Sequence, residues 1–169
     1  AGLAEEFSDL RYVIVGDGHD EQRLRDLASE LGVTERVIFA GLLSDAELPE
    51  AYATSTLYVG LSRVDREVNA EGFGISFIEA GASGVPSLAG DSGGVRSAVR
   101  DGETGIVVPP TDLASVTSAI TVLLRDDNRR RSMGEAARRA VETHYNWDRL
   151  ARETREFTYS VVGERTVGR

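Results

Sequence analysis

The sequence predicts an α/β domain with a parallel sheet, helices on both of its faces and further helices after the sheet. Two observations carry this prediction. Short apolar, β-branched runs alternate with segments whose leucines recur at helical spacing, and this alternation begins near residue 11. After Pro109-Pro110 the strand-like runs stop and only helical patterns follow. With 169 residues, 41% of them apolar and 28% charged, the chain is long enough for one compact domain with a hydrophobic core.

The first elements are a strand and a helix. Arg11 to Gly16 is a short apolar run that ends in glycine, and it predicts a buried strand. The leucines of Asp20 to Leu31 predict a helix, and Gly32 supplies its stop signal. Two further strands are expected in this half of the chain, over Arg36–Ala40 and Leu57–Gly60.

A capping box and a polar loop separate the next elements. Ser44-Asp45-Ala46-Glu47 has the Ser-x-x-Glu spacing of a capping box, so a helix is expected to open there and to run through Tyr52. The polar stretch from Ser62 to Ala70 is expected to be a loop. The apolar segment after it predicts a helix over Gly74–Ala82.

The rest of the chain first completes the sheet and then becomes helical. Thr111 or Asp112 is expected to cap the first of the later helices. Little apolar content remains after Gly163, and the tail to Arg169 is expected to be frayed. The expected elements are a strand over Val85–Ala89, a short helix over Gly94–Val99, a strand over Gly105–Val108, and helices from residue 112 to Leu124, Asp127 to His144 and Trp147 to Phe157.

The segment from Glu71 to Glu79 combines glycines, an apolar helix start and two spaced carboxylates. Gly72 and Gly74 let bare backbone approach a ligand. A helix starting near Gly74 would offer unpaired N–H groups and a positive dipole end to a phosphate. Glu79 follows Glu71 by eight positions, roughly 12 Å along a helix, with a modest angular offset. A nucleotide sugar, with hydroxyls at both ends and a diphosphate between them, suits this pattern.

Composition excludes several other classes of function. A net charge of −9 disfavours nucleic acid or an anionic bilayer as the main partner. Without cysteine the chain has no disulfides, thiolate metal sites or cysteine nucleophiles. All basic side chains are arginine, which excludes a P-loop or Schiff-base lysine. No apolar run reaches the length of a transmembrane helix.

From about Arg11 to Trp147 the sequence resembles the C-terminal, donor-binding half of a family 4 retaining glycosyltransferase. This is a large group with two facing Rossmann-like domains, known as the GT-B fold. The likeness is most specific from Glu71 to Pro109. Four landmarks carry it, in the order of the family: Val15-Gly16-Asp17-Gly18; Val37-Ile38-Phe39-Ala40-Gly41; Glu71 to Glu79 continuing into Ala80-Gly81-Ala82-Ser83-Gly84-Val85-Pro86; and Gly93-Gly94 followed by Asp101-Gly102-Glu103-Thr104-Gly105-Ile106-Val107-Val108-Pro109.

The resemblance implies a role for each site residue. Glu71 would be the catalytic carboxylate beside the donor sugar, and Glu79 would accept hydrogen bonds from the ribose hydroxyls. The other expected donor contacts are the backbone N–H groups of Phe73, Gly74 and Ile75, the loop glycines Gly16 and Gly18, and Leu43 and Asp45 at the base. Arg63 and Arg66 are candidate phosphate contacts. The chain departs from the family at Arg96 and Ser97, where a proline and a glutamate are common.

The resemblance further implies transfer of a hexose from a nucleoside-diphosphate sugar to a hydroxyl acceptor. No cofactor or metal is expected, because the chain has no Asp-x-Asp pattern and no histidine–carboxylate cluster at ligand spacing. The expected partners are the donor and an N-terminal acceptor domain of the same protein, through which peripheral membrane contact could occur, and the expected location is cytoplasmic.

Residues 1–169 are expected to be one nucleotide-sugar-binding domain that is a fragment of a longer enzyme. The family's first strand and helix, which carry an arginine and a lysine against the diphosphate, and its acceptor domain would be missing, so the fragment alone is expected to be inactive. Two alternatives stay open: a sugar-nucleotide epimerase of GT-B architecture and a non-catalytic module that binds a nucleotide sugar or a partner.

Overall fold

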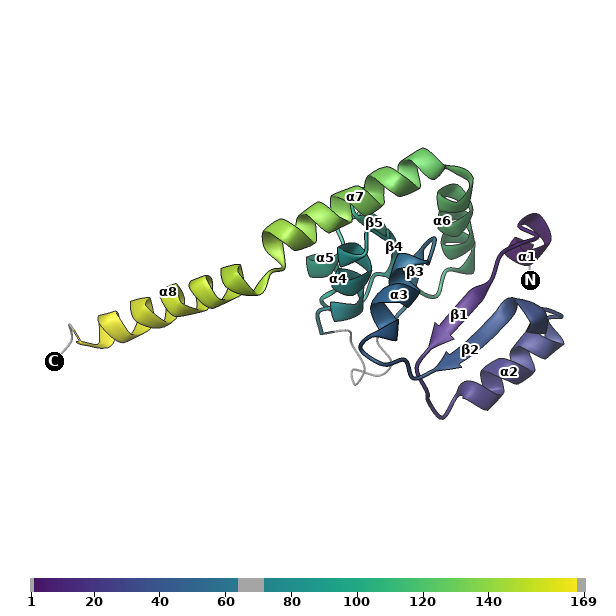
Figure 1. Cartoon of the computed structure of the whole chain (residues 1–169), viewed down its shortest axis with the longest axis horizontal. Coiled ribbons are helices and arrows are strands. Elements are labelled where there is room, and N and C mark those ends of the chain that lie inside the picture. Colours follow the sequence, from purple (N-terminus) through teal and green to yellow (C-terminus); the bar gives the residue numbers. More distant parts are fainter. Residues whose placement is uncertain (1, 64–71, 167–169) are drawn as a thin grey trace. The chain divides into compact units, whose positions relative to one another are not determined.

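Figure 1 shows the computed structural model of the chain, which describes residues 2–63 and 72–166, with side chains described through Val162. The chain divides into two compact units, Ala1–Thr54 and Ser55–Arg169. Each unit is an alternation of strands and helices, as the sequence predicts, and the strands within each unit are parallel.

Unit 1 contains a two-stranded parallel sheet and its helices. Tyr12 of the first strand lies opposite Val37 of the second. Helix α2 lies against this sheet, with the Arg25 guanidinium 4.1 Å from the centre of the Phe39 ring. A short 3-10 helix, which the sequence pattern does not predict, precedes the second strand. The elements are α1 (Gly2–Glu6), β1 (Tyr12–Val15), α2 (Glu21–Glu30), η1 (Thr34–Arg36), β2 (Val37–Gly41) and α3 (Glu47–Ala53).

The prediction that the first strand is buried is wrong. In β1 the side chains of Tyr12, Val13 and Val15 are 51%, 48% and 43% exposed. A parallel strand is buried only where elements cover both faces of its sheet. Ala28 is the one buried residue recorded among those described in unit 1. The apolar run therefore identifies the strand correctly but not its degree of burial.

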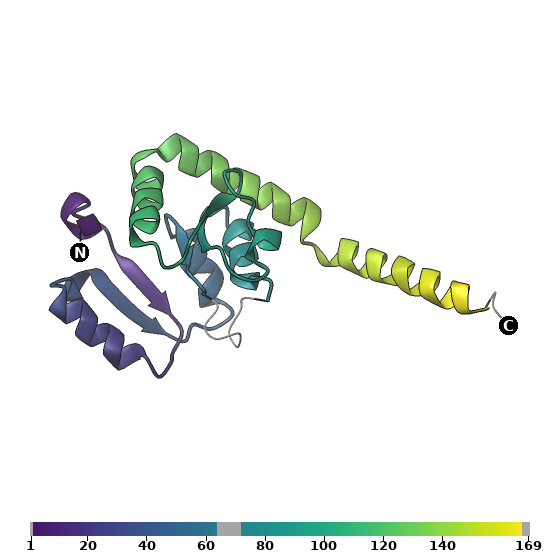
Figure 2. The same ribbon diagram turned by 180° about the vertical axis from the view of Figure 1, so that it is seen from behind.

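Unit 2 holds a three-stranded parallel sheet and five helices among its described residues. The strand order is β3-β4-β5, with Tyr58 opposite Ser87 and Ser87 opposite Gly105. The elements, which can be followed from behind in Figure 2, are β3 (Tyr58–Gly60), α4 (Ile75–Ala82), β4 (Ser87–Gly90), α5 (Val95–Ala98), β5 (Gly105–Val108), α6 (Leu113–Arg125), α7 (Asp127–His144) and α8 (Trp147–Thr166).

Both faces of the unit 2 sheet are covered by helices. Successive side chains of β4 point to opposite faces, so Leu88 and Ala89 belong to different cores. Ala89 packs with Phe77 of α4 and with α5, whereas Leu88 packs with Val116 and Ala119 of α6. The predicted α/β arrangement with helices on both sides is therefore confirmed in this unit.

Strand pairing differs from the single sheet that the sequence suggests. Among the described residues β1 pairs with β2, and β3, β4 and β5 form a separate sheet. Alternation of strand and helix indicates parallel strands, because each helix carries the chain back across the sheet. It contains no information on which strands are neighbours, so the division into two sheets could not be predicted from it.

Close packing of small residues joins α7 to the rest of unit 2. A Cβ built on Gly81 of α4 would lie 3.4 Å from the Ala137 Cβ of α7. A Cβ built on Gly134 would lie only 2.0 Å from the backbone oxygen of Gly84. Since real Cβ atoms do not approach an oxygen so closely, α7 reaches the turn before β4 only because residue 134 is glycine.

The later helices begin where capping residues predict. Asp112 accepts hydrogen bonds from the N–H groups of Ala114 and Ser115, at 3.1 and 3.3 Å, and caps α6. Helix α8 continues to Thr166, beyond the expected end at Phe157. The frayed tail stays a prediction, since residues 167–169 lie outside the described part. None of the described helices is both long enough and apolar enough to cross a membrane.

We predict that Gly134→Ala destabilises the protein, although alanine normally stabilises a helix interior by about 1 kcal/mol relative to glycine. The new Cβ would meet the Gly84 oxygen, so the free energy of unfolding should fall by about 1 to 3 kcal/mol. Urea denaturation measures the change. Ser132→Ala, at an exposed position of the same helix, is the control and should change stability by less than about 0.5 kcal/mol. A stabilised Gly134→Ala protein would contradict the packing described here.

Candidate functional site

The carboxyl ends of β3, β4 and β5 form one edge of the unit 2 sheet, because the strands are parallel. The turn Asp91–Gly94 leaves this edge after β4 and leads into α5. The glycine loop, defined here as Gly72–Gly74, leads into α4. Ligands of open α/β sheets bind beyond the carboxyl ends of the strands. This edge is therefore the place to look for a site.

Glycines bring backbone segments together at this edge. A Cβ on Gly94 would lie 2.0 Å from the Gly72 oxygen and 3.3 Å from the Phe73 Cα. A Cβ on Gly90 would lie 2.9 Å from the Ser62 oxygen. The glycine loop thus rests directly on the turn before α5, with no side chain between the two backbones.

Helix α4 begins at the glycine loop without a side-chain cap. Gly74 is its N-cap residue, is buried and has the left-handed φ of 90° that glycine tolerates best. A Cβ there would lie 2.5 Å from the Phe77 ring. The first N–H groups of a helix have no partner within it, and the helix dipole adds partial positive charge at this end. The start of α4 is therefore suited to an anion.

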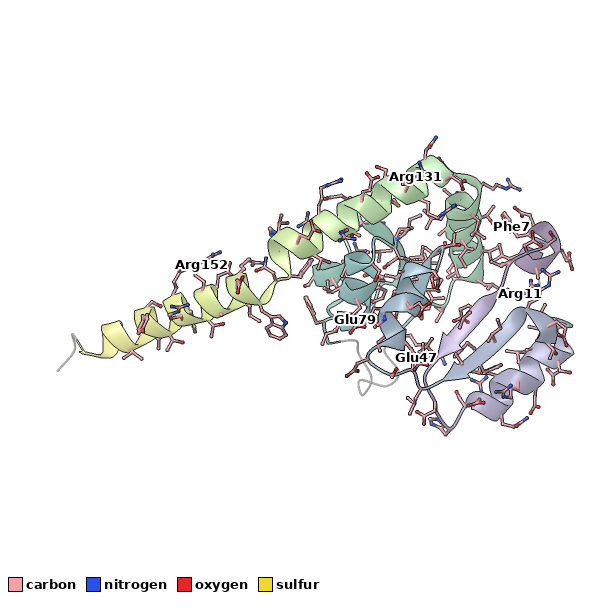
Figure 3. All side chains as sticks on the ribbon, viewed as in Figure 1. Phe7, Arg11, Glu47, Glu79, Arg131 and Arg152 are labelled. Carbon is pink, nitrogen blue, oxygen red and sulfur yellow. The ribbon has the colours of Figure 1, made fainter. Side chains whose placement is uncertain are left out.

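Most of the predicted residues of unit 2 lie at or near the start of α4. Phe73 is 39% exposed and Ile75 is 68% exposed. Glu79 is exposed on α4, as Figure 3 shows, and it stands four positions after Ile75, so both residues lie on the same face of the helix. Arg63 is exposed shortly after β3. Glu71 and Arg66 fall outside the described residues, so the predicted pairing of Glu71 with Glu79 remains a prediction.

The predicted residues of unit 1 lie on two adjacent loops. The N–H of Gly16, whose φ is 115°, donates to the Gly41 oxygen at 2.8 Å, so the loops after β1 and β2 run side by side. Gly18 and Asp45 are exposed and Leu43 is half-buried. The predicted site residues therefore fall into two groups, one in each unit.

The Ser44–Glu47 hydrogen bonds of the predicted capping box form in unit 1, but α3 begins only at Glu47, with Ala46 as its N-cap residue. The Ser44 N–H donates to the Glu47 carboxylate at 2.9 Å, and the Ser44 hydroxyl donates to the same oxygen at 2.6 Å. These hydrogen bonds, the one from the hydroxyl first, lower the pKa of Glu47. The contacts fix the loop that carries Leu43 and Asp45 to the start of α3.

An ion pair that was not predicted from the sequence joins the turn Asp91–Gly94 to α5. Arg96 of α5 donates two hydrogen bonds to Asp91, at 2.6 and 2.8 Å. The bond from Arg96 lowers the pKa of Asp91 and keeps the carboxylate ionised. Because both groups are exposed, the pair adds little stability. Its effect is local, since it neutralises a carboxylate next to a site expected to hold a diphosphate.

The fourth sequence landmark has a structural role. The Asp101 carboxylate accepts a hydrogen bond from the Val107 N–H at 2.9 Å, and the buried Thr104 hydroxyl accepts one from the Arg100 N–H at 2.9 Å. A Cβ on Gly105 would lie 2.3 Å from the Ser87 oxygen of β4. These contacts shape the turn into β5. The presence of these residue types in the motif is therefore explained by their structural contacts, and no ligand is needed to explain it.

One buried polar atom at the edge has no partner. The Ser92 hydroxyl, in the turn between β4 and α5, makes no hydrogen bond with any residue that the structure describes. Within residues 2–63 and 72–166 there is also no group of three or more histidine and acidic side chains that could hold a metal ion.

Comparison with protein families decides which family this arrangement represents. The family model "Glycosyl transferases group 1" matches residues 1–140. The chain belongs to the group 1 glycosyltransferase family. This confirms the resemblance seen in the sequence, and the Rossmann-like α/β fold of the two units agrees with it.

Curated relatives of this group 1 glycosyltransferase chain are mannosyltransferases and other glycosyltransferases. A GDP-mannose-dependent alpha-(1-6)-phosphatidylinositol monomannoside mannosyltransferase of Mycobacterium tuberculosis is 38% identical over 146 residues, which are 86% of this chain and 38% of the relative. A D-inositol 3-phosphate glycosyltransferase of Nocardia farcinica is 42% identical over 130 residues, 74% of this chain and 28% of the relative. The chain therefore spans well under half the length of these relatives.

Solved structures support the same fold. Sucrose-phosphate synthase from Thermosynechococcus elongatus matches 90% of this chain and 38% of its own, with a TM-score of 0.79 and 28% identity. HepE from Anabaena in complex with UDP matches 94% of this chain and 43% of its own, with a TM-score of 0.83 and 23% identity. At that level of identity the second likeness shows the fold alone.

We predict that Gly94→Ala displaces the glycine loop, because its Cβ would occupy the space of the Gly72 oxygen. In a ¹⁵N–¹H correlation spectrum, the amide signals of Gly72, Phe73 and Gly74 should move, and the free energy of unfolding should fall by about 1 to 3 kcal/mol. Ser97→Ala, at an exposed position of α5, is the control and should leave the loop signals in place. Loop signals that also stay in place for Gly94→Ala would show that the two backbones are not in contact.

Proposed function

We propose that the full-length protein transfers a hexose from a nucleoside-diphosphate sugar to a hydroxyl acceptor, with retention at the anomeric carbon, and that this chain binds the donor. One observation carries the proposal: the uncapped start of α4, preceded by a glycine loop, lies at the carboxyl edge of a parallel sheet in a chain of the group 1 glycosyltransferase family.

The start of α4 supports binding of the diphosphate. Backbone N–H groups at Gly74 and Ile75 would donate to phosphate oxygens, and the helix dipole would stabilise the negative charge that grows on the leaving diphosphate. The net charge of −9 supplies no general attraction for a dianion. Binding therefore has to come from such local groups, among which Arg63 and Arg66 are candidates.

The acidic residues would bind the two hydroxyl-bearing ends of the donor. Glu79 stands one turn into α4 from Ile75 on the same face, where a carboxylate can accept both ribose hydroxyls while the diphosphate lies at the helix start. Glu71 would accept hydrogen bonds from the sugar hydroxyls beside the reacting carbon. Gly16, Gly18, Leu43 and Asp45 of unit 1 stay predicted donor contacts.

GDP-mannose is the donor that we propose first, because the M. tuberculosis relative is named as GDP-mannose-dependent. The acceptor would bind to an N-terminal domain of the same protein, as in other two-domain enzymes of GT-B architecture. We further propose transfer without a metal ion, with arginine, backbone N–H groups and the helix dipole stabilising the leaving diphosphate.

Titration of the protein with GDP-mannose, UDP-glucose and ADP-glucose by isothermal calorimetry tests the proposal. Binding of at least one nucleotide sugar is expected, and lack of binding by all three would contradict the assignment of the site. Release of nucleotide or inversion at sugar carbon 2 without an acceptor would instead identify the protein as an epimerase.

We predict that Glu79→Ala weakens binding of GDP-mannose by about 10-fold or more, since hydrogen bonds to a charged group contribute about 1.5 to 3 kcal/mol. Because Glu79 is exposed, the melting temperature should change little. Glu135→Ala removes an exposed carboxylate from α7 and is the matched control, with unchanged affinity expected. Equal dissociation constants for the two variants would remove Glu79 from the donor site.

A further inference from the structure

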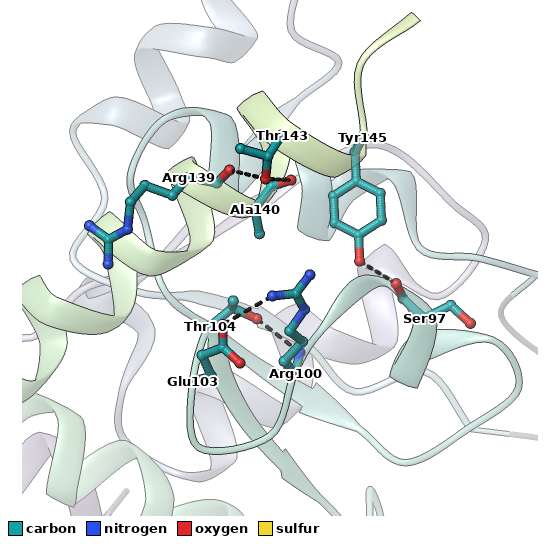
Figure 4. Close-up of polar contacts among 8 residues, drawn as sticks. All are labelled: Ser97, Arg100, Glu103, Thr104, Arg139, Ala140, Thr143 and Tyr145. Carbon is teal, nitrogen blue, oxygen red and sulfur yellow. Dashed lines mark hydrogen bonds and ion pairs between the residues drawn. The ribbon is translucent and has the colours of Figure 1, made fainter. Parts of the chain in front are cut away.

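Tyr145 connects the end of α7 to both segments of the candidate donor site. Its ring packs edge to face against Phe73 of the glycine loop, with ring centres 5.9 Å apart and planes inclined by 64°. Its hydroxyl donates a hydrogen bond to the backbone oxygen of Ser97 in α5, as Figure 4 shows. Its own N–H donates to the Val141 oxygen and ends α7.

The two segments that Tyr145 contacts are the two that meet at Gly94. Phe73 follows Gly72, whose backbone oxygen lies against Gly94, and Ser97 lies one turn after Gly94 in α5. The glycine loop is therefore held from two sides: by the α5 turn through backbone contact, and by the Tyr145 ring through the side chain of Phe73. Displacement of Tyr145 would release the second of these contacts.

Tyr145 also lies two positions before the start of α8. The side-chain oxygen of Asn146 accepts a hydrogen bond from the Arg149 N–H at 2.8 Å, and α8 starts at Trp147. Two adjacent residues therefore form the junction between α7 and α8. Asn146 caps the start of α8, and Tyr145 contacts Phe73 of the glycine loop. A change in the direction of α8 would be transmitted to Phe73 through Tyr145.

We propose that Tyr145 is a positioning residue for the nucleotide-sugar donor: it holds the glycine loop in the conformation that binds diphosphate and makes donor affinity dependent on the α7–α8 junction. The inference rests on the proposed function. Its physical basis is preorganisation, because a loop already fixed in its bound conformation loses less conformational freedom when the ligand binds.

Substitutions of Tyr145, with GDP as the ligand in isothermal calorimetry, test the proposal. Tyr145→Leu removes the ring contact and the hydroxyl, and we expect the dissociation constant to rise about 10-fold. Tyr145→Phe keeps the ring against Phe73, and the rise should be only about threefold. Tyr159→Leu removes a tyrosine that is 70% exposed on α8 and should leave the dissociation constant unchanged.

Two further measurements separate positioning from a general loss of stability. In Tyr145→Leu without ligand, the amide signals of Phe73, Gly74 and Gly94 should move. The Phe73→Leu, Tyr145→Leu double variant should bind GDP no more weakly than the weaker single variant, because both changes break one contact.

These measurements distinguish failure of the proposed function from failure of the proposed role of Tyr145. If the unsubstituted protein binds none of GDP, UDP and ADP, the proposed function fails together with the inference; if it binds UDP or ADP instead of GDP, that nucleotide is the ligand for the variants. If it binds GDP and Tyr145→Leu lowers the melting temperature without changing the dissociation constant, only the role of Tyr145 is overturned. Additive losses in the double variant would likewise overturn it.

Discussion

The candidate site depends on direct contact between two backbones at the carboxyl edge of the unit 2 sheet. The Gly72 oxygen occupies the space in which any residue but glycine at position 94 would place its Cβ. This contact fixes the glycine loop on the turn before α5, and the loop in turn fixes where α4 begins. The uncapped start of α4, the exposed face that carries Ile75 and Glu79, and the contact of Phe73 with Tyr145 all follow from that placement.

Local electrostatics explain how so acidic a chain would bind a diphosphate. With a net charge of −9 and no lysine, the protein has no general attraction for phosphate. The start of α4 contributes oriented N–H groups, which need no charged side chain. Arg96 neutralises Asp91 beside the same turn, so the neighbouring carboxylate adds no net repulsion. The strength of the proposed site therefore lies in backbone geometry, which composition does not reveal.

The sequence predicted the local features well and the long-range ones poorly. The Ser44–Glu47 hydrogen bonds, the Asp112 cap and the strand runs are set by neighbouring residues and are confirmed. The exposure of β1 and the division of the strands into two sheets depend on what packs against each strand, which a linear pattern does not contain. The contacts of Tyr145 with Phe73 and Ser97 were also missed, because they join residues far apart in the sequence, 48 positions in the case of Ser97.

Whether a diphosphate binds at the start of α4 can be measured directly by mapping GDP binding on the backbone amides of the protein with ¹⁵N–¹H correlation spectroscopy. We expect the largest changes on saturation at Phe73, Gly74 and Ile75, with smaller ones at Gly94, because the phosphates would lie at the start of α4 against the glycine loop. Binding of GDP that leaves these amides unchanged and moves signals elsewhere in the chain would contradict it.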